Sequence, residues 1–115
     1  KSKLPEPAVI GNAGSFFKNP VVDENQLLLL NEKFPDIPYF LSGEKYKIPA
    51  AYLIEKCGWK GRRFGNCGVY EKHSLILVNY GNATGEEIYQ LSENIRQSVQ
   101  DKFGIWLERE VIVVE

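Results

Sequence analysis

The stretch TGEEIYQLSENIRQSVQDKFG, from Thr84 to Gly104, carries the clearest structural signal in this sequence. Thr84 followed three residues later by Glu87 is the pattern of a capping box, in which each side chain bonds the other residue's backbone N–H at the start of a helix. Gly104 supplies the left-handed residue that commonly ends a helix. Between them, apolar residues recur at helical spacing, and they are Ile88, Leu91, Ile95, Val99 and Phe103. The pattern predicts one long helix whose apolar stripe the rest of the domain must cover.

Two shorter helices and several short strands are expected around this long helix. Asp23 is suited to cap a helix over residues 24–33, and Pro49 suits the first turn of a helix over residues 50–56. The run LILVN at 75–79 is typical of a buried strand. Further strand residues are expected at 15–17, 21–22, 105–107 and 111–114. Because helices and strands do not alternate in βαβ order, we predict a single-domain α+β fold with a mixed, mainly antiparallel sheet and about three helices.

The composition is that of an ordinary globular domain. The chain has 115 residues, of which 43% are hydrophobic and 25% charged, enough to build one core without metal or disulfide support. A formal net charge of -1 excludes a general electrostatic attraction to nucleic acid or to an anionic membrane surface. The sequence has no apolar run of the ~18 residues that a membrane span needs, and no signal-peptide pattern. We therefore expect no nucleic-acid partner and no membrane partner.

The cysteine and methionine content suggests a compartment and an origin. Cys57 and Cys67 are the two cysteines, and they have neither C-x-x-C spacing nor the partners of a zinc site. We expect two reduced, mostly buried thiols, no metal, and a cytoplasmic protein. The sequence starts at Lys1 and contains no methionine, so we expect it to be one part of a longer protein.

The decapeptide GNAGSFFKNP, from Gly11 to Pro20, holds the most unusual group of polar residues. Its first four residues form either a plain turn or a loop whose backbone N–H groups bind an anion, and their spacing matches neither a P-loop nor a dinucleotide fingerprint. Ser15 lacks the G-x-S-x-G frame of a serine hydrolase, so it is either a strand-edge hydroxyl or a proton donor held by nearby groups. Lys18, Asn19 and Lys3 either bind phosphate oxygens or lie on an ordinary solvated surface.

Two further segments carry charged residues with more than one interpretation. In LEREV, Glu108 and Glu110 share one side of a strand because side chains alternate, so they are either an acid/base pair or an exposed polar face. In WKGRRF, at 59–64, basic residues lie between aromatic residues, which is typical of an RNA-stacking surface or of a solvated loop. The net charge of -1 favours the solvated loop.

Four blocks of this sequence, taken in order, resemble one known family. They run from Lys3 to Val111 and are KLPEP…GNAGSFFKNP, AAYLIEKCGWKG, GVYEKHSLILVNYGNAT and FGIWLEREV. Through these blocks the chain is similar to the C-terminal domain of the UDP-N-acetylenolpyruvoylglucosamine reductase (MurB) family, in its longer-insert type. The resemblance implies that residues 1–115 form the substrate-binding C-terminal domain of a longer flavoenzyme, whose FAD-binding part precedes them.

The resemblance also implies an activity. Members of the family are oxidoreductases of peptidoglycan synthesis, and so of cell wall biogenesis, cell shape and cell division. They use NADPH to reduce FAD, and then reduce UDP-N-acetylglucosamine enolpyruvate to UDP-N-acetylmuramate. The implied cofactors and partners are FAD, NADPH, the UDP-sugar substrate and the missing N-terminal domain, while the fragment alone is expected to bind no flavin and to be inactive. The alternative is a non-catalytic module of the same fold that binds a nucleotide sugar or a phosphate.

Five residues take the positions of the family's functional residues. Ser15 matches the serine that protonates the enolate-like carbon after hydride addition, and Glu110 matches the glutamate of the family's L-E-x-E-V segment. A glutamate has an ordinary pKa of about 4.3, so a protonated Glu110 needs burial or surroundings that raise its pKa. Lys3 and Asn19 match residues that contact the substrate near its diphosphate. His73 stands where some members have a substrate-binding glutamine, and this departure leaves its role open.

Overall fold

The computed structural model describes residues 8–10, as backbone, and residues 16–110. Three helices lie in this part of the chain: α1 (Glu24–Lys33), α2 (Ala50–Lys56) and α3 (Gly85–Phe103). The strands are short, and they are β1 (Ala8–Ile10), β2 (Val21–Val22), β3 (Phe40–Ser42), β4 (Lys45–Lys47), β5 (Arg63–Phe64), β6 (Cys67–Val69) and β7 (Leu77–Asn79). The predicted α+β class with about three helices is confirmed.

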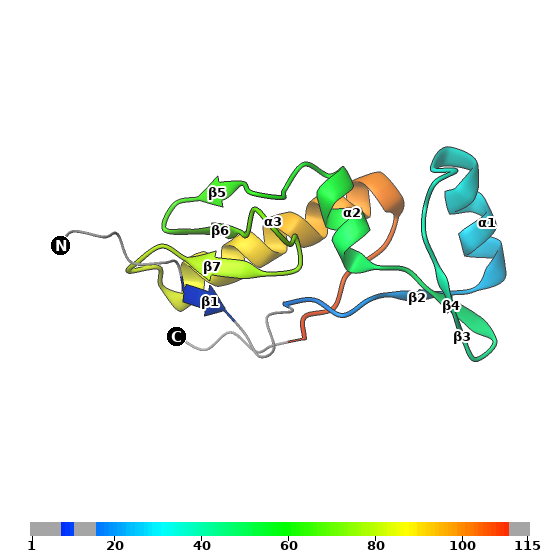
Figure 1. Cartoon of the computed structure of the whole chain (residues 1–115), viewed down its shortest axis with the longest axis horizontal. Helices are drawn as coiled ribbons and strands as arrows, with labels where there is room; N and C mark the ends of the chain where they lie inside the picture. The colour runs from blue at the N-terminus through cyan, green and yellow to red at the C-terminus, as the bar shows by residue number, and fades with distance from the viewer. Residues whose placement is uncertain (1–7, 11–15, 111–115) are drawn as a thin grey trace.

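The strands form two antiparallel sheets in the described residues. One has the order β1-β7-β6-β5 and the other the order β2-β4-β3. In the first sheet Val78 pairs with Gly68, and in the second Lys47 pairs with both Val21 and Phe40. Figure 1 shows α3 running behind the first sheet, while α1 lies beside the second sheet at the other end of the molecule. We call α2, α3 and the first sheet the body, and residues 21–47 the small lobe.

The helix α3 forms because both of its ends are capped as the sequence predicts. The hydroxyl of Thr84 accepts from the N–H of Glu87 (3.1 Å), and the carboxylate of Glu87 accepts from the N–H of Thr84 (3.0 Å). Gly104 ends the helix at φ 72°, a conformation that costs glycine little. The buried face consists of Ile88, Leu91, Ser92, Ile95, Val99 and Phe103. One polar side chain, that of Ser92, is therefore enclosed in the apolar stripe.

The small lobe is built around α1. The carboxylate of Asp23 accepts from the N–H of Gln26 (2.8 Å) and so caps the helix at its predicted start. Leu27 and Leu30 are buried. Two neighbouring leucines, Leu28 and Leu29, are exposed on the same helix. Four leucines in a row cannot all face one core at helical spacing, so two of them must point outward.

Three side-chain contacts of the described residues join the small lobe to the body, and one of them is the ion pair of Lys56 with Asp36, with 3.7 Å between Nζ and Oδ2. The hydroxyl of Tyr52, on α2, donates to a carboxylate oxygen of Asp36 (2.9 Å). The ring of Phe34 lies 4.5 Å, centroid to centroid, from the ring of Phe103 at the end of α3. Burial and the neighbouring carboxylate raise the pKa of Tyr52 to about 12. The phenol of Tyr52 therefore stays protonated and donates its hydrogen bond to Asp36 of the small lobe.

Three of the expected strands differ in the structure. Of the strand expected at 15–17, the described residues 16–17 form only an isolated bridge, between Phe17 and Arg109. The strand predicted for 75–79 begins at Leu77 because a turn precedes it, in which the N–H of Ile76 donates to the carbonyl of His73 (3.1 Å). Residues 105–107 form no strand, because the carbonyl of Leu107 accepts from the side chain of Arg96 rather than from a neighbouring strand. Residues 21–22 form β2 as expected. Residue 15 and residues 111–114 lie outside the described residues.

Candidate functional site

Three segments that are far apart in the sequence meet at Phe16. Its backbone N–H donates to the carbonyl of Leu75 (2.9 Å), and its carbonyl accepts from the N–H of Glu110 (2.7 Å). The N–H of Lys18 donates to the carbonyl of Glu108 (2.8 Å), so these two segments run antiparallel. The segment that follows position 15, the loop that contains position 73, and position 110 are thereby brought to one edge of the body.

The two glutamates of LEREV lie on the outer side of their segment, as the alternation predicts. Glu108 and Glu110 are both exposed, whereas Leu107 is buried. Glu108 forms an ion pair with Lys18, with 3.8 Å between Oε1 and Nζ. This contact favours the polar-face interpretation for Glu108 and leaves Glu110 as the candidate acid or base. The described residues do not bury Glu110, so they do not supply the enclosure that a protonated glutamate needs.

Asn19 lies where the chain leaves the body for the small lobe. Its Oδ1 accepts from the N–H of Ala50 (2.8 Å), the first residue of α2. The carbonyl of Ala51, the next residue of α2, accepts from the hydroxyl of Ser74 (2.9 Å). The start of α2 therefore holds both the Asn19 segment and the loop that contains position 73. Because the amide oxygen is engaged, the exposed Asn19 offers its NH₂ group, a hydrogen-bond donor, to the surroundings.

His73 is exposed, and one ring nitrogen is engaged by the backbone. Nδ1 accepts from the N–H of Leu75 (3.2 Å). The neutral ring must then carry its proton on Nε2. His73 thus offers an N–H donor, which is the kind of group that a glutamine amide would offer from this position.

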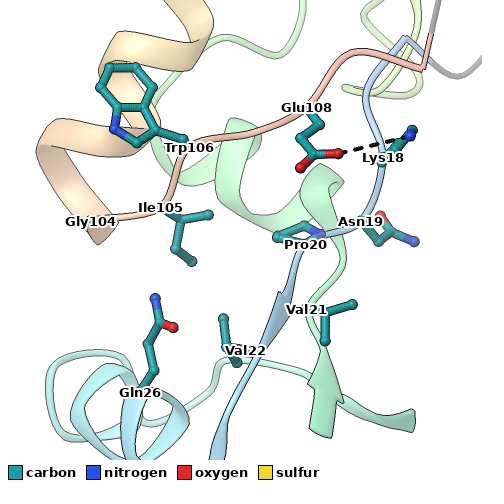
Figure 2. A pocket seen from close by; sticks show the side chains of 10 residues that line it. All are labelled: Lys18, Asn19, Pro20, Val21, Val22, Gln26, Gly104, Ile105, Trp106 and Glu108. Carbon is teal, nitrogen blue, oxygen red and sulfur yellow. Dashed lines mark ion pairs between the residues drawn. The ribbon is translucent and has the colours of Figure 1, made fainter. Parts of the chain in front are cut away.

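A hollow of about 420 Å³ opens beside Asn19. Figure 2 shows Lys18 and Asn19 on one wall and Trp106 and Glu108 on the other. The first turn of α1 contributes Gln26. The walls combine an exposed indole with charged and amide groups, so the hollow suits a ligand that has both polar and flat apolar parts.

The inward-facing Arg109 connects this segment to α3. Its Nε donates to the hydroxyl of the buried Ser92 (2.8 Å), and its Nη2 pairs with the carboxylate of Glu93. Arg96 also pairs with Glu93, with 2.6 Å between Nη1 and Oε2. The hydrogen bond from Arg109, supported by Arg96, holds the pKa of Glu93 below its ordinary value.

The sequence did not single out these α3 residues as part of a site. A polar residue within an apolar helical stripe indicates that something polar must meet it there, because a buried hydroxyl without a partner is costly. Ser92 occupies such a position, four residues after Ile88. Its hydroxyl donates to the carbonyl of Tyr89 in the same helix (2.7 Å) and accepts from Arg109, which is 17 residues away, and sequence spacing does not reveal this second contact.

Two of the proposed site residues, Ser15 and Lys3, lie outside the described residues, and so does the GNAG loop. Their assigned roles stay predictions. The structure brings the segments of His73 and Glu110 together at Phe16, the residue that follows Ser15 in the chain. It places Asn19 three residues further on, against α2.

Side chains already cap the helix starts at which a flavin dinucleotide could be bound in the described residues. A dinucleotide's diphosphate is commonly bound by free N–H groups at a helix N-terminus. Here side chains of Asp23, Asn19 and Thr84 already accept N–H groups at the starts of α1, α2 and α3, respectively.

Other candidate chemistry is absent from the part of the chain that the structure describes. That part contains no group of three or more His, Cys, Asp or Glu residues placed to hold a metal ion. Cys67 is buried and Cys57 half-buried, both are free, and burial raises the pKa of each thiol. No helix within residues 16–110 is both long enough and apolar enough to cross a membrane.

The basic segment WKGRRF is engaged within the fold. The guanidinium of Arg62 lies 4.3 Å from the ring centroid of Trp59, and that of Arg63 lies 4.1 Å from the ring of Tyr80. Lys60 pairs with Glu55, with 3.6 Å between Nζ and Oε2. These contacts occupy cations and aromatic faces that an RNA-stacking surface would need free.

One protein-family model matches nearly the whole chain. It covers residues 6–114 and describes the C-terminal domain of UDP-N-acetylenolpyruvoylglucosamine reductase. This match spans the segments that form the body, the small lobe and the candidate site.

Curated proteins named UDP-N-acetylenolpyruvoylglucosamine reductase are similar to this chain. The one from Porphyromonas gingivalis is 52% identical over 111 residues, which cover 96% of this chain and 33% of that relative. The one from Amoebophilus asiaticus is 48% identical over 116 residues, covering 100% of the chain and 34% of the relative. The one from Chromobacterium violaceum is 48% identical over 115 residues, covering 99% and 34%. The chain spans about a third of the length of the curated relatives it matches.

Proposed function

This chain belongs to the family of UDP-N-acetylenolpyruvoylglucosamine reductase C-terminal domains, and we propose that it is the substrate-binding domain of a flavoenzyme. In this proposal the full-length protein uses NADPH to reduce UDP-N-acetylglucosamine enolpyruvate to UDP-N-acetylmuramate. The reaction provides a precursor for peptidoglycan in the cytoplasm. The chain by itself is inactive, because the flavin and the nicotinamide bind to the remainder of the protein.

The observation that carries the proposal is the meeting of three segments at Phe16. Hydrogen bonds of its N–H and carbonyl join it to Leu75 and to Glu110. Glu110 is thus hydrogen-bonded to Phe16, the residue that follows Ser15 in the chain, although positions 15 and 110 are 95 residues apart in sequence. A reaction that adds a hydride and a proton to one double bond needs such a pair of proton-handling groups on one rigid base.

The chain's own residues would handle the proton. When bound by the remainder of the protein, a reduced flavin would supply the hydride that adds to one vinyl carbon of the substrate, and the electron pair of the double bond would be left on the other carbon, next to the carboxylate. The hydroxyl of Ser15 gives its proton to that carbon, and the resulting alkoxide regains a proton from solvent or from a neighbouring acid. Glu110 stabilises the charge that develops during this transfer or returns the proton, and the remainder of the protein covers its exposed carboxyl group.

Three further residues would bind the substrate. The NH₂ group of Asn19 is directed outward by the bond of its oxygen to Ala50, so it can donate to a diphosphate oxygen. The Nε2–H of His73 offers a second donor. Lys3 adds a cation for the same anionic group. These two hydrogen-bond donors and one cation together suit the anionic oxygens of a nucleotide diphosphate.

The test separates the two halves of the reaction in the full-length protein. Ser15→Ala should leave reduction of the flavin by NADPH unchanged within about twofold, while reduction of the enolpyruvyl substrate should fall by at least about 100-fold, because a positioned proton donor contributes about that much. Stopped-flow absorbance of the flavin measures both rates. Ser42→Ala, in β3 of the small lobe, is the matched control and should change neither rate.

Two outcomes would contradict the proposal. Equal loss of both half-reactions in Ser15→Ala would show that the serine serves folding instead of proton transfer. A full-length protein that binds the UDP-sugar but contains no flavin would show that the chain belongs to a non-catalytic nucleotide-sugar module.

A further inference from the structure

A group of α3 side chains grips the segment that carries Glu110. We call it the α3 clamp, and it consists of Ser92, Glu93 and Arg96 on α3 together with Arg109. The clamp holds the segment at two points. Arg96 Nε donates to the backbone carbonyl of Leu107 (2.8 Å), and the guanidinium of Arg109 bonds Ser92 and Glu93.

The clamp is more enclosed than the ion pair on the other side of the same segment. The side chains of Glu93 and Arg109 are 32% and 20% exposed, whereas those of Lys18 and Glu108 are 53% and 77% exposed. The guanidinium of Arg109 also lies 4.4 Å from the ring centroid of Tyr89. Charges held by several partners and shielded from water fix geometry better than a single exposed pair does.

The clamp decides which way Glu110 points. Successive side chains of an extended segment point to opposite sides, so binding Arg109 to α3 directs Glu110 away from α3. The antiparallel bridge between Phe17 and Arg109 sets the register. A slip of one residue would exchange the two sides, and it would place the guanidinium where the carboxylate now lies.

We propose that Arg109 is a positioning residue, which acts through its bonds to Ser92 and Glu93 to hold the carboxylate of Glu110 toward the reacting carbon of the substrate. This inference rests on the proposed function, because it assigns a purpose to a contact behind the catalytic segment. Arg109 itself is bonded to α3, so in this proposal it does not contact the substrate. Its effect on the reaction therefore passes entirely through Glu110.

The test is a double-mutant cycle in the full-length reductase. Arg109→Gln should lower kcat for substrate reduction about 10- to 100-fold, since displacing a catalytic group by about 1 Å can cost about 100-fold. Flavin reduction by NADPH should stay within about twofold. In a Glu110→Gln background, Arg109→Gln should cause no further loss of kcat, because the group that it positions is already absent. Lys60→Gln, which breaks the exposed pair with Glu55, is the matched control and should leave kcat unchanged.

Milder variants keep the test informative if Arg109→Gln fails to fold. Ser92→Ala removes one partner of the guanidinium without changing charge, and it should lower kcat less than Arg109→Gln does. Arg109→Lys keeps the charge but loses the bond to Ser92, so it should recover part of the activity.

The outcomes of this cycle separate the clamp from the proposed function. Glu110→Gln is expected to lower kcat for substrate reduction. If Arg109→Gln lowers kcat by the same factor in the Glu110→Gln background as in the wild type, Arg109 has a general structural role and the clamp proposal is wrong. If all clamp variants retain wild-type kcat while Glu110→Gln does not, the clamp proposal also fails and the proposed function stands. If Glu110→Gln and Ser15→Ala both retain full substrate reduction, the proton-transfer roles assigned to these residues are wrong, and the positioning role is lost with them. If the full-length protein reduces no enolpyruvyl substrate, the proposed function itself fails.

Discussion

The body and the small lobe differ in how completely they bury their apolar side chains. In the body, Leu91, Ile95 and Val99 of α3 are completely buried against the first sheet. The small lobe buries four large apolar side chains within residues 21–47, namely Val22, Leu27, Leu30 and Ile37. It also exposes six of the nine large apolar side chains that are exposed in the described residues, namely Val21, Leu28, Leu29, Tyr39, Phe40 and Leu41.

The difference indicates where the candidate site gets its rigidity. Phe16 and Phe17, which precede the small lobe in sequence, are almost completely buried, with their rings 5.2 Å apart. The backbone of the candidate site is therefore attached to the body's core. The small lobe extends from the site at Asn19 and rejoins the body at Ala50, so its local opening should require less free energy than opening of the body.

The largest expected effect on stability comes from truncating a buried side chain in the core of the body. Leu91→Ala should lower the free energy of unfolding of this chain by about 2–5 kcal/mol, because it leaves a cavity at a fully buried position. Urea denaturation followed by circular dichroism measures the change.

An exposed leucine of the small lobe provides the matched control for that experiment. Leu29→Gln, at a side chain that is 65% exposed, should change the free energy of unfolding by no more than about 0.5 kcal/mol. Equal costs for Leu91→Ala and Leu29→Gln would show that the two regions do not differ in the way described.

The junction of the two regions should give an intermediate effect. Asn19→Ala removes the acceptor of the Ala50 N–H, so it should cost about 1 kcal/mol of stability. Asn19→Asp keeps an acceptor there and should cost less than half as much, but it replaces the outward NH₂ donor with a carboxylate oxygen. Asp should therefore weaken binding of the UDP-sugar to the full-length protein although the fold is kept. Thermal unfolding and substrate titration, measured on the same preparations, separate the two roles.

The opposite pattern at position 19 would contradict both assignments. An Asp variant that binds substrate normally would remove the proposed donor role of the amide. An Ala variant with unchanged stability would remove its role at the start of α2.

The smallest expected effect tests the link from α2 to the small lobe. The pKa of Tyr52 is raised from 10.0 to about 12 in the folded chain, so the folded state holds this proton more tightly than the unfolded state does. Its contribution to stability is complete below pH 10 and is lost as the pH rises through about 12. Phenolate absorbance should show one tyrosine ionising near pH 12 in the wild type but not in Tyr52→Phe. If the two titration curves coincide, the phenol does not make the contact with Asp36.

The sequence predicted the helices well because their signals are local. The capping box of Thr84 and Glu87, the N-cap at Asp23 and the glycine stop at Gly104 all act within a few residues, and each is present in the structure. The strand predicted at 75–79 was too long at its start. Its apolar residues are preceded by a turn whose Ser74 hydroxyl donates to the backbone carbonyl of Ala51 in α2, a contact that the local sequence does not show.

For the candidate site, the sequence supplied residue types and the fold supplied their arrangement. Alternation along LEREV correctly placed the two glutamates opposite Arg109. The sequence could not show that Lys18 pairs with Glu108, or that Asn19 holds the first residue of α2, because these partners lie 90 and 31 residues apart.

By itself the sequence determined the three helices, their ends, the fold class and the family, because caps, helical spacing and characteristic blocks depend on residues close together in the chain. Only the tertiary structure decided that the segments containing positions 16, 75 and 110 share one set of backbone hydrogen bonds. It also decided that Arg109 is held by α3. The physical reason is that a contact between distant residues forms only where the buried core brings their segments together, and no local pattern records that geometry.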